Sequence, residues 1–321
     1  QTMHQAHKSR FRNSKTVQLF DRYATYNGSD PYQTPATLSI IPHLEYNLGA
    51  YFPVGGMIEI PNSLVRLAEE LGVQFRLSEA VEKIRTNGNT ADGIQTKSGL
   101  YDFDFVASNA DIRPTYDQLL PAPLRPNKLL KQARSSSGII FYWGIKQTFE
   151  ALGVHNIFFS KDYKAEFNAL FKQETLFEDP TVYVHISSKV AREDAPEGCE
   201  NWFVLVNAPA NSGQDWDEMV QQCRKQVIDK INRILGINLE DYLVAEDYLD
   251  PRRIETRTSS SGGALYGNAS NNKFAAFLRH PNYRSAIKNM YWIGGSVHPG
   301  GGIPLCLSSA KIAAKLFKEN A

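Results

Sequence analysis

Residues 289–311 read NMYWIGGSVHPGGGIPLCLSSAK, an apolar run that passes through five glycines into a second apolar run. We predict a strand at 289–293, a loop at 294–304 and a helix at 305–317. Glycine lets a backbone approach a ligand closely because no Cβ is present, and a helix N-terminus adds free N–H groups and partial positive charge. The junction predicts a site for an anionic or polarisable ligand; the alternative is a tight turn that needs glycine only for packing.

The regions on either side of residue 115 predict different kinds of structure. A loop at 51–57 opens onto a helix at 61–71, and short strand candidates follow at 73–77, 81–85, 93–96 and 102–107. This order is typical of the interior of an α/β nucleotide-binding domain.

The second region is rich in aromatic and β-branched residues. Strands are predicted at 138–145, 181–187 and 201–207, helices at 167–177 and 215–235, and a turn at 155–156. We interpret this part as a separate mixed sheet with covering helices. Two further helices are predicted before residue 115, at 14–26 and 34–44.

Bulk properties restrict the class of partner. The 321 residues include 42% hydrophobic and 21% charged residues, with a net charge of +1, so the basic surplus typical of nucleic-acid binding is absent. No run of about 18 apolar residues predicts a transmembrane helix, although a monotopic membrane contact stays open. Cys199, Cys223 and Cys306 lack metal-ligand spacing, so we expect free thiols, no metal site and a cytoplasmic location.

The segment 291–311 resembles the C-terminal signature of the bacterial phytoene desaturase family of carotenoid desaturases. Other stretches match in the same order: GAYFPVGGM at 49–57, VASNAD at 106–111, HNIFFSKDY at 155–163, APEGCE at 195–200 and RHPN at 279–282. Together with FYWGI and ENWF, the serine–valine form of the signature is most similar to the subgroup that acts on 1-hydroxylated carotenoids and introduces a 3,4 double bond.

The resemblance implies an α/β fold with two domains. One is an FAD-binding α/β domain of the amine oxidase-like flavoprotein type, at 51–115 and 285–321; the other is a mixed β-sheet and helix substrate domain, at 1–50 and 116–284. The family's amino-terminal G-x-G-x-x-G unit is not found in this sequence. We therefore expect a truncated chain or an absent earlier segment, and FAD binding by this chain that is weak or lacking.

Cofactor contacts are also implied by the resemblance. A flavin that accepts hydride gains negative charge over N1 and the C2 carbonyl, and a strand–glycine–helix junction suits that charge. Gly55, Gly56 and Met57 fall on the substrate side of the flavin, the Val81 backbone meets the adenine, and Asn109 and Asp111 lie in a stretch near the cofactor. The ring-side positions are Gly294, Gly295, His298, Pro299, Gly300, Gly301, Gly302, Ile303 and Pro304.

The function that follows is FAD-dependent carotenoid desaturation, in which a C40 polyene loses a hydride to the flavin and a proton from the neighbouring carbon and gains a C=C bond. The expected partners are a long apolar carotenoid and a membrane surface; the electron acceptor is unassigned. The alternatives are a phytoene-type desaturase, a polyene isomerase or saturase, and a flavin-free lipid-binding carrier. Val297 and Leu305 stand where the family usually has threonine and a small residue, which bears on substrate type.

Several residues keep two interpretations. His298 is the weak catalytic candidate, acting in proton transfer or only shaping the loop. Arg279 and His280 line a cavity or form a surface ion pair, and Asp111 orients cofactor hydroxyls or caps the following segment. The aromatic side chains are core or line the long apolar tunnel that a polyene requires: Phe141, Tyr142, Trp143, Phe158, Phe159 and Phe203.

Overall fold

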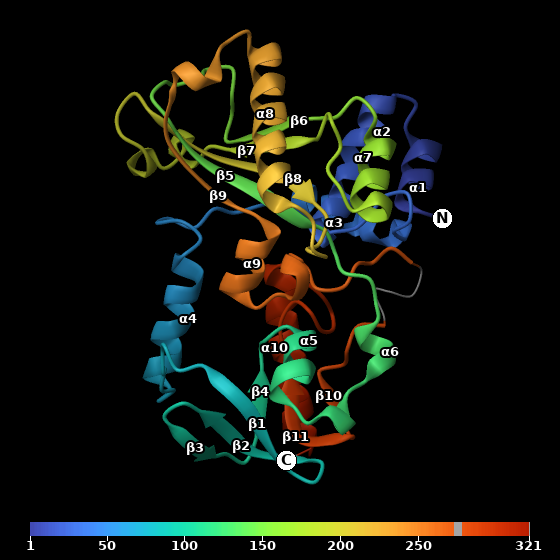
Figure 1. The fold of residues 1–321 in the computed structure, drawn as a ribbon, viewed down its shortest axis with the longest axis vertical. Helices are drawn as coiled ribbons and strands as arrows, with labels where there is room; N and C mark the ends of the chain where they lie inside the picture. Colours follow the sequence, from blue (N-terminus) through green and yellow to red (C-terminus); the bar gives the residue numbers. More distant parts are fainter. Residues whose placement is uncertain (273–277, 321) are drawn as a thin grey trace.

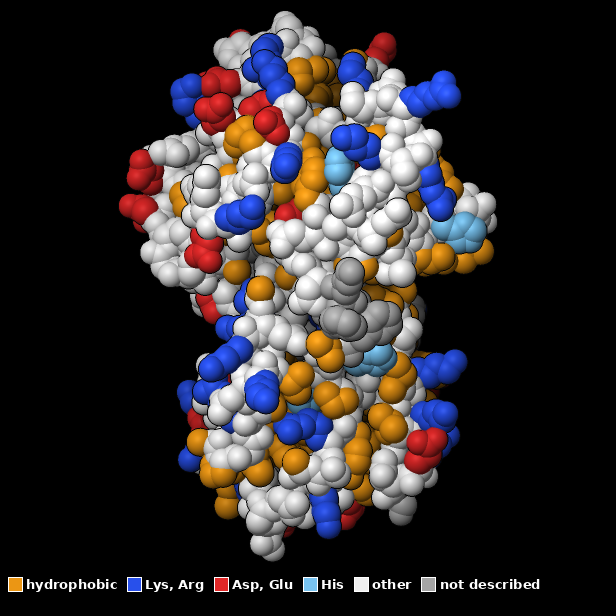
Figure 2. Space-filling model, turned by 90° about the vertical axis from the view of Figure 1, so that its right-hand side faces the viewer, with side chains coloured by type: hydrophobic (Ala, Val, Ile, Leu, Met, Phe, Trp, Pro, Cys, Tyr) orange, Lys and Arg blue, Asp and Glu red, His pale blue; other side chains and the backbone are white. Residues whose placement is uncertain are grey.

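The computed structural model describes residues 1–272 and 278–320. Two sheets lie in two bodies stacked along the long axis of the molecule, with α9 (Pro251–Thr258) between them (Figure 1). Figure 2 shows that the bodies are joined by a narrower waist. The predicted α/β fold, with mixed sheets and helices, is confirmed.

The upper body is built on an antiparallel five-stranded sheet. Its order is β6-β7-β8-β5-β9, formed by β5 (Ser137–Ile145), β6 (His155–Phe158), β7 (Val182–His185), β8 (Glu200–Ala208) and β9 (Leu243–Leu249). The strands predicted at 138–145, 181–187 and 201–207 are confirmed. The turn predicted at 155–156 is wrong, because these residues pair with Val184 and His185 in β6–β7.

The two faces of this sheet differ in burial. Alternate residues of β8 such as Trp202 and Val204 are fully buried in a core shared with Cys223 and Val227 of α8 (Trp216–Leu235). The residues between them, such as Phe203, are only half-buried. One face of the sheet is thus closed by α8, and the other is open.

Short helices flank the open side. They are α1 (Met3–Arg10), α2 (Ser14–Asp21), α3 (Ile40–Leu48) and α7 (Tyr163–Asn168), with 3-10 turns at Arg22–Asn27 and Ala36–Ser39. The buried Asp21 carboxylate of α2 joins α1 to α2. It accepts hydrogen bonds from the Nδ1 atoms of His4 (2.6 Å) and His7 (2.8 Å). The helix predicted at 167–177 begins earlier, where the Asp162 side chain caps it, and ends in a π-helical turn at Ala169–Gln173.

The lower body contains the six-stranded sheet. Its strands are β1 (Val81–Asn87), β2 (Thr90–Thr96), β3 (Gly99–Asp102), β4 (Val106–Ser108), β10 (Tyr283–Arg284) and β11 (Ile287–Trp292). The late strand β11 runs parallel to β2 and β4, which returns the C-terminal part of the chain to this body. Its core joins Ile84 and Trp292 to Tyr116 and Leu130. The division predicted at residue 115 stays a prediction.

Helices of the lower body vary in how far they are packed. They are α4 (Glu59–Glu70), α5 (Ile112–Pro114), α6 (Asn127–Leu130) and α10 (Ile303–Asn320). α4 is set apart from the sheet in Figure 1 and buries none of its residues. The strand predicted at 73–77 is wrong, because a strand needs a hydrogen-bonded neighbour and, within the described residues, β1 pairs only with β2.

Candidate ligand site at the glycine loop

The glycine loop, residues 294–304, joins the end of β11 to the start of α10. Gly294, Gly300 and Gly302 have φ of 100°, 139° and 98°, in the region that L side chains rarely adopt. A Cβ on Gly294 would overlap the side-chain oxygen of Asn109. Glycine is therefore required here both by backbone conformation and by the close approach of Asn109.

Buried polar side chains hold the loop from behind. The Asn282 Nδ2 lies 2.9 Å from the carbonyl oxygens of Trp292 and His298 and 2.8 Å from Ser309 Oγ. Ser309 Oγ in turn accepts from the Gly294 N–H at 3.1 Å. One amide group thus ties the end of β11, the middle of the loop and the second turn of α10 together.

Arg279 supports the same loop from the other side. Its side chain is 4% exposed and donates to the carbonyl oxygens of Gly295 (3.3 Å), Tyr266 (3.1 Å) and Asn268 (2.8 Å). Burial lowers the pKa of the guanidinium to about 10, with a smaller contribution from nearby Arg134. The surface ion pair considered for Arg279 is wrong, because the group is buried and binds carbonyl oxygens.

His280 is also buried rather than at the surface. Its Nε2 lies 2.9 Å from Tyr116 Oη, and its Nδ1 lies 2.7 Å from the carbonyl oxygen of Pro281. Burial lowers the pKa of His280 to about 4, so the imidazole is neutral at pH 7. Its carbonyl oxygen accepts from the His298 N–H at 2.9 Å, which makes His280 a second support of the loop.

The front of the loop is open. Gly302 and Ile303 are exposed, and a Cβ on Gly302 would meet no atom within 4 Å. The first helical bond of α10 runs from the Cys306 N–H to the Gly302 carbonyl at 2.9 Å. The N–H groups of Ile303 and Leu305 therefore point out of the helix end without an intrahelical acceptor. This arrangement fits the pyrimidine edge of a flavin, whose N1 and C2 carbonyl accept hydrogen bonds and carry negative charge on reduction.

The structure brings some predicted residues to the loop and leaves others apart. Asn109 contacts Gly294, as described above. Gly55, Gly56 and Met57 form an open turn before α4, with φ of 85° and 87° at the two glycines. Val81 begins β1 and is more than one-third exposed. Among the described residues, no hydrogen bond joins either place to the glycine loop.

Two further predicted residues, Asp111 and His298, form hydrogen bonds within the protein. The Asp111 carboxylate accepts from the Arg113 N–H at 3.0 Å as the cap of α5, and it forms a buried ion pair with Arg134. His298 is half-buried, and only its main chain hydrogen-bonds to other described residues. Its predicted role in proton transfer stays a prediction.

Sequence reasoning missed the residues that support the loop. Ser309 and Asn282 are buried polar groups, and Ser296 Oγ accepts from the Ile112 N–H at 3.0 Å. A usable signal was present: Asn282 belongs to the RHPN stretch, and Ser309 is a polar residue in a mostly apolar helix. Their partners lie 10 to 184 positions away along the chain, so the contacts themselves were not readable.

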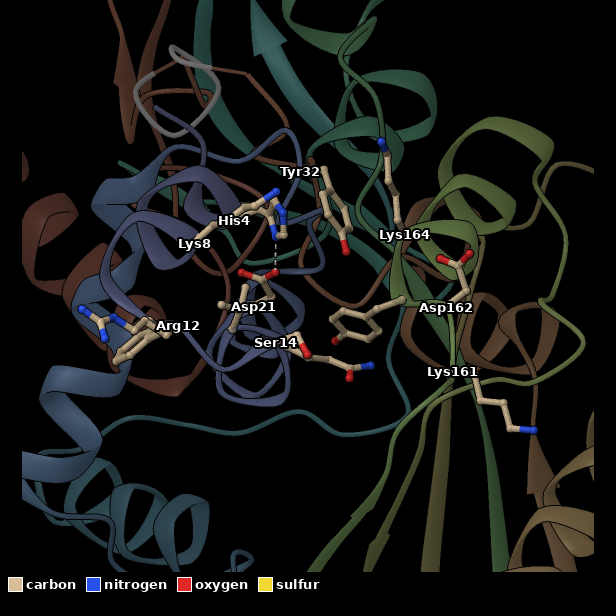
Figure 3. A pocket seen from close by; sticks show the side chains of 13 residues that line it. His4, Lys8, Arg12, Ser14, Asp21, Tyr32, Lys161, Asp162 and Lys164 are labelled. Atoms are coloured by element: carbon tan, nitrogen blue, oxygen red, sulfur yellow. Dashed lines mark hydrogen bonds and ion pairs between the residues drawn. The ribbon is translucent and has the colours of Figure 1, made fainter.

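A separate cavity of about 460 Å³ lies beside α1 and α2 (Figure 3). Charged residues make up nearly half of its lining, among them Lys8, Arg12, Lys161 and Asp162, and the His4 ring points at Asp21. Burying these charges under a polyene would be unfavourable. Within residues 1–272 and 278–320, no group of three or more His, Cys, Asp or Glu side chains is placed to share a metal ion.

Comparisons with known proteins agree with this geometry. The chain is 55% identical over 98% of its length to a 1-hydroxycarotenoid 3,4-desaturase of Flavobacterium sp. (strain P99-3) and covers 64% of that protein. It is 32% identical over 96% of its length to a phytoene desaturase of Neurospora crassa and covers 55% of it. The chain thus spans between half and two-thirds of these relatives, and the resemblance to carotenoid desaturases is confirmed.

The fold is shared with a solved oxidoreductase structure. An oxidoreductase from Methanosarcina mazei superposes with a TM-score of 0.64 over 99% of this chain and 68% of its own, at 13% identity. The family described as flavin containing amine oxidoreductase matches residues 2–316. With the glycine loop in place between β11 and α10, this match over nearly the whole chain shows that the protein belongs to the flavin-containing amine oxidoreductase family.

Proposed function

We propose that the full-length protein is an FAD-dependent carotenoid desaturase, and that its substrate is a 1-hydroxylated carotenoid desaturated at the 3,4 bond. The observation that carries the proposal is the glycine loop, whose open front presents helix N-terminal N–H groups and whose back is held by buried side chains. The relative that is 55% identical bears the name of this activity.

The chain's own residues position the reaction. The N–H groups of Ile303 and Leu305 would face the edge of the cofactor that becomes negative, and Gly302 keeps that space free of a side chain. Asn282 and Arg279 would keep the donors in place without contacting the cofactor. Bound FAD would supply the acceptor for the hydride removed from the polyene.

The open face of the five-stranded sheet is the surface we assign to the polyene. Phe203 and Tyr142 face each other across β5–β8 with ring centroids 5.7 Å apart, in an edge-on contact. Ile157 and Leu205 lie on the same half-buried face. Such a surface suits an apolar chain, because burial of a hydrocarbon against aromatic and aliphatic side chains is favourable without hydrogen bonds.

We also propose a cytoplasmic protein that touches the membrane from which the carotenoid is taken. Ile40, Leu44 and Leu48 form a stripe along α3 and are 51%, 46% and 66% exposed. Figure 2 shows further apolar side chains among Lys and Arg on one face of the lower body. Among the described residues, no helix is both long and apolar enough to cross a bilayer.

The first test is flavin binding and reduction by the full-length protein. We expect FAD titration to give bound flavin absorbance bands, and anaerobic addition of a 1-hydroxylated acyclic carotenoid to bleach them. Failure of the protein to take up FAD while it still binds carotenoid would replace this proposal with that of a carrier. Bound flavin that stays oxidised with every carotenoid tried would also contradict desaturation.

A matched pair of glycine variants locates the flavin. Gly302→Val places a side chain in the open front of the loop, and we expect FAD affinity to fall about tenfold or more. Gly213→Val is the control, because Gly213 has a similar φ of 103° and equally open surroundings, but lies in the loop before α8. Equal losses of affinity in both variants would argue against the glycine loop as the flavin site.

A further inference from the structure

A cavity of about 420 Å³ lies where the open face of the five-stranded sheet meets the 50–57 segment. We call it the histidine pocket; its lining includes Tyr51, Phe52, Met57, His155, His185 and Phe203. We propose that His185, supported by His155 and Tyr183, hydrogen-bonds the hydroxyl group of the hydroxylated polyene and so selects it over a hydrocarbon. This inference rests on the proposed function and names the residues that determine its substrate.

Sheet register places the two histidines side by side. His155 on β6 is paired with His185 on β7, and His185 is paired with Phe203 on β8. Directly paired residues project to the same face of a sheet. The two imidazole rings accordingly stack, with centroids 5.0 Å apart and planes 21° apart. Polar rings therefore continue the aromatic row of Phe203 and Tyr142 toward the edge of the sheet.

His155 is engaged through one ring nitrogen by Tyr183, whereas His185 is engaged through neither. The His155 Nδ1 lies 2.8 Å from Tyr183 Oη. Neither ring nitrogen of His185 has a hydrogen-bond partner among the described residues. Burial, together with the neighbouring His155, lowers the pKa of His185, so its ring is neutral at pH 7. A neutral imidazole offers one donor and one acceptor, the complement that an alcohol requires.

The rest of the pocket makes this polar group selective. Phe52, Met57 and Phe203 offer no strong hydrogen bond to a ligand, and the Tyr51 hydroxyl group already donates to the Leu48 carbonyl oxygen at 3.2 Å. A hydrocarbon end bound here would cover the His185 nitrogens without a partner, which is unfavourable. A hydroxyl group would remove that cost. The pocket therefore discriminates by leaving its own polar group unpaired when the wrong substrate binds.

The position of the pocket agrees with the chemistry of the proposed substrate. Met57, which the family resemblance places on the substrate side of the flavin, belongs to the lining. In a 1-hydroxycarotenoid the hydroxyl carbon is only two bonds from the carbon that enters the new 3,4 double bond. The proposal therefore requires the 55–57 turn, which the histidine pocket adjoins, to lie beside the bound flavin.

The test compares two substrates that differ only in the hydroxyl group. For the FAD-loaded full-length protein, kcat/KM and the equilibrium dissociation constant are measured with a 1-hydroxylated acyclic carotenoid and with its non-hydroxylated counterpart. We expect His185→Leu to lower the preference for the hydroxylated substrate about tenfold or more, equivalent to about 1.4 kcal/mol. His185→Gln retains a donor and an acceptor and should restore most of the preference. His43→Leu, at an exposed histidine on α3, is the matched control.

The inference is overturned if His185→Leu keeps the wild-type preference for the hydroxylated carotenoid. This holds whether kcat/KM is unchanged or falls equally for both substrates. Failure of the proposed function looks different. If the wild type binds both carotenoids but oxidises neither, desaturation fails, and the ratio of dissociation constants still decides the role of His185. A His185→Leu variant that does not fold is replaced by His185→Phe, which keeps an aromatic ring in the stack but removes the hydrogen-bonding nitrogens.

Discussion

Single polar side chains account for the shape of the glycine loop. Asn282 reaches three acceptors, Arg279 reaches three carbonyl oxygens, and His280 connects Tyr116 to the loop through its ring and its carbonyl group. All three side chains are buried. Removing any one of them therefore leaves its own hydrogen-bond partners unsatisfied, because solvent cannot reach them. The loop geometry is thus determined by residues that do not themselves contact the proposed ligand.

The buried imidazole of His280 predicts a loss of stability in acid. Its pKa in the folded protein is about 4, below the ordinary value of 6.5, so the unfolded chain binds the proton first as pH falls. The free energy of unfolding should therefore decrease between about pH 6.5 and pH 4, by about 3 kcal/mol at most from this group. Urea denaturation at a series of pH values checks the slope, with His280→Gln as the non-titrating variant.

The comparison of variants isolates His280 from other titrating groups. We expect a shallower decline in His280→Gln than in the wild type. Parallel slopes in wild type and His280→Gln would contradict a depressed pKa at this position.

At the level of elements, helices with similar patterns play different roles. α8 and α4 both carry apolar residues at helical intervals, and both were predicted from that spacing. Ile231 and Val227 of α8 are fully buried against the five-stranded sheet, whereas Leu67 and Leu64 of α4 are about half exposed. Periodicity indicates which face is apolar, but it does not indicate what covers that face.

This difference predicts unequal costs for the same kind of substitution. Ile231→Ala should lower the free energy of unfolding of this chain by about 2–5 kcal/mol, because it leaves a cavity in a packed core. Leu67→Ala should change it by about 0.5 kcal/mol or less. Urea titrations followed by tryptophan fluorescence measure both. A large loss in Leu67→Ala would mean that α4 is packed in solution.

For the whole molecule, the exposed stripe on α3 predicts binding to a lipid surface. Partition of the full-length protein onto vesicles of phosphatidylglycerol and phosphatidylcholine should fall about tenfold or more when Ile40, Leu44 and Leu48 are all changed to Ser, since each gives up apolar burial in the bilayer. The control changes Ile234 and Val244, also exposed, to Ser. Equal flotation of both variants would argue against α3 as the contact.

What the sequence determined by itself was local. It identified the glycine loop with its flanking strand and helix, three of the strands of the five-stranded sheet (β5, β7 and β8), α8 and the family. These features depend on residue type and spacing within short windows, where period 2 or 3.6 and glycine conformation act directly. The departures came from strand pairing, which is not local: 73–77 lacks a pairing partner, and 155–156 is a strand only because β7 lies beside it.

The tertiary structure decided which distant side chains meet. Asn109, the 279–282 stretch with Arg279 and Asn282, and Ser309 converge on the glycine loop from three parts of the sequence, and His155 meets His185 through the register of β6 and β7. A shift of one residue in that register would turn one histidine to the opposite face of the sheet. Short-range patterns do not encode such pairings, because burial of the whole core selects the register.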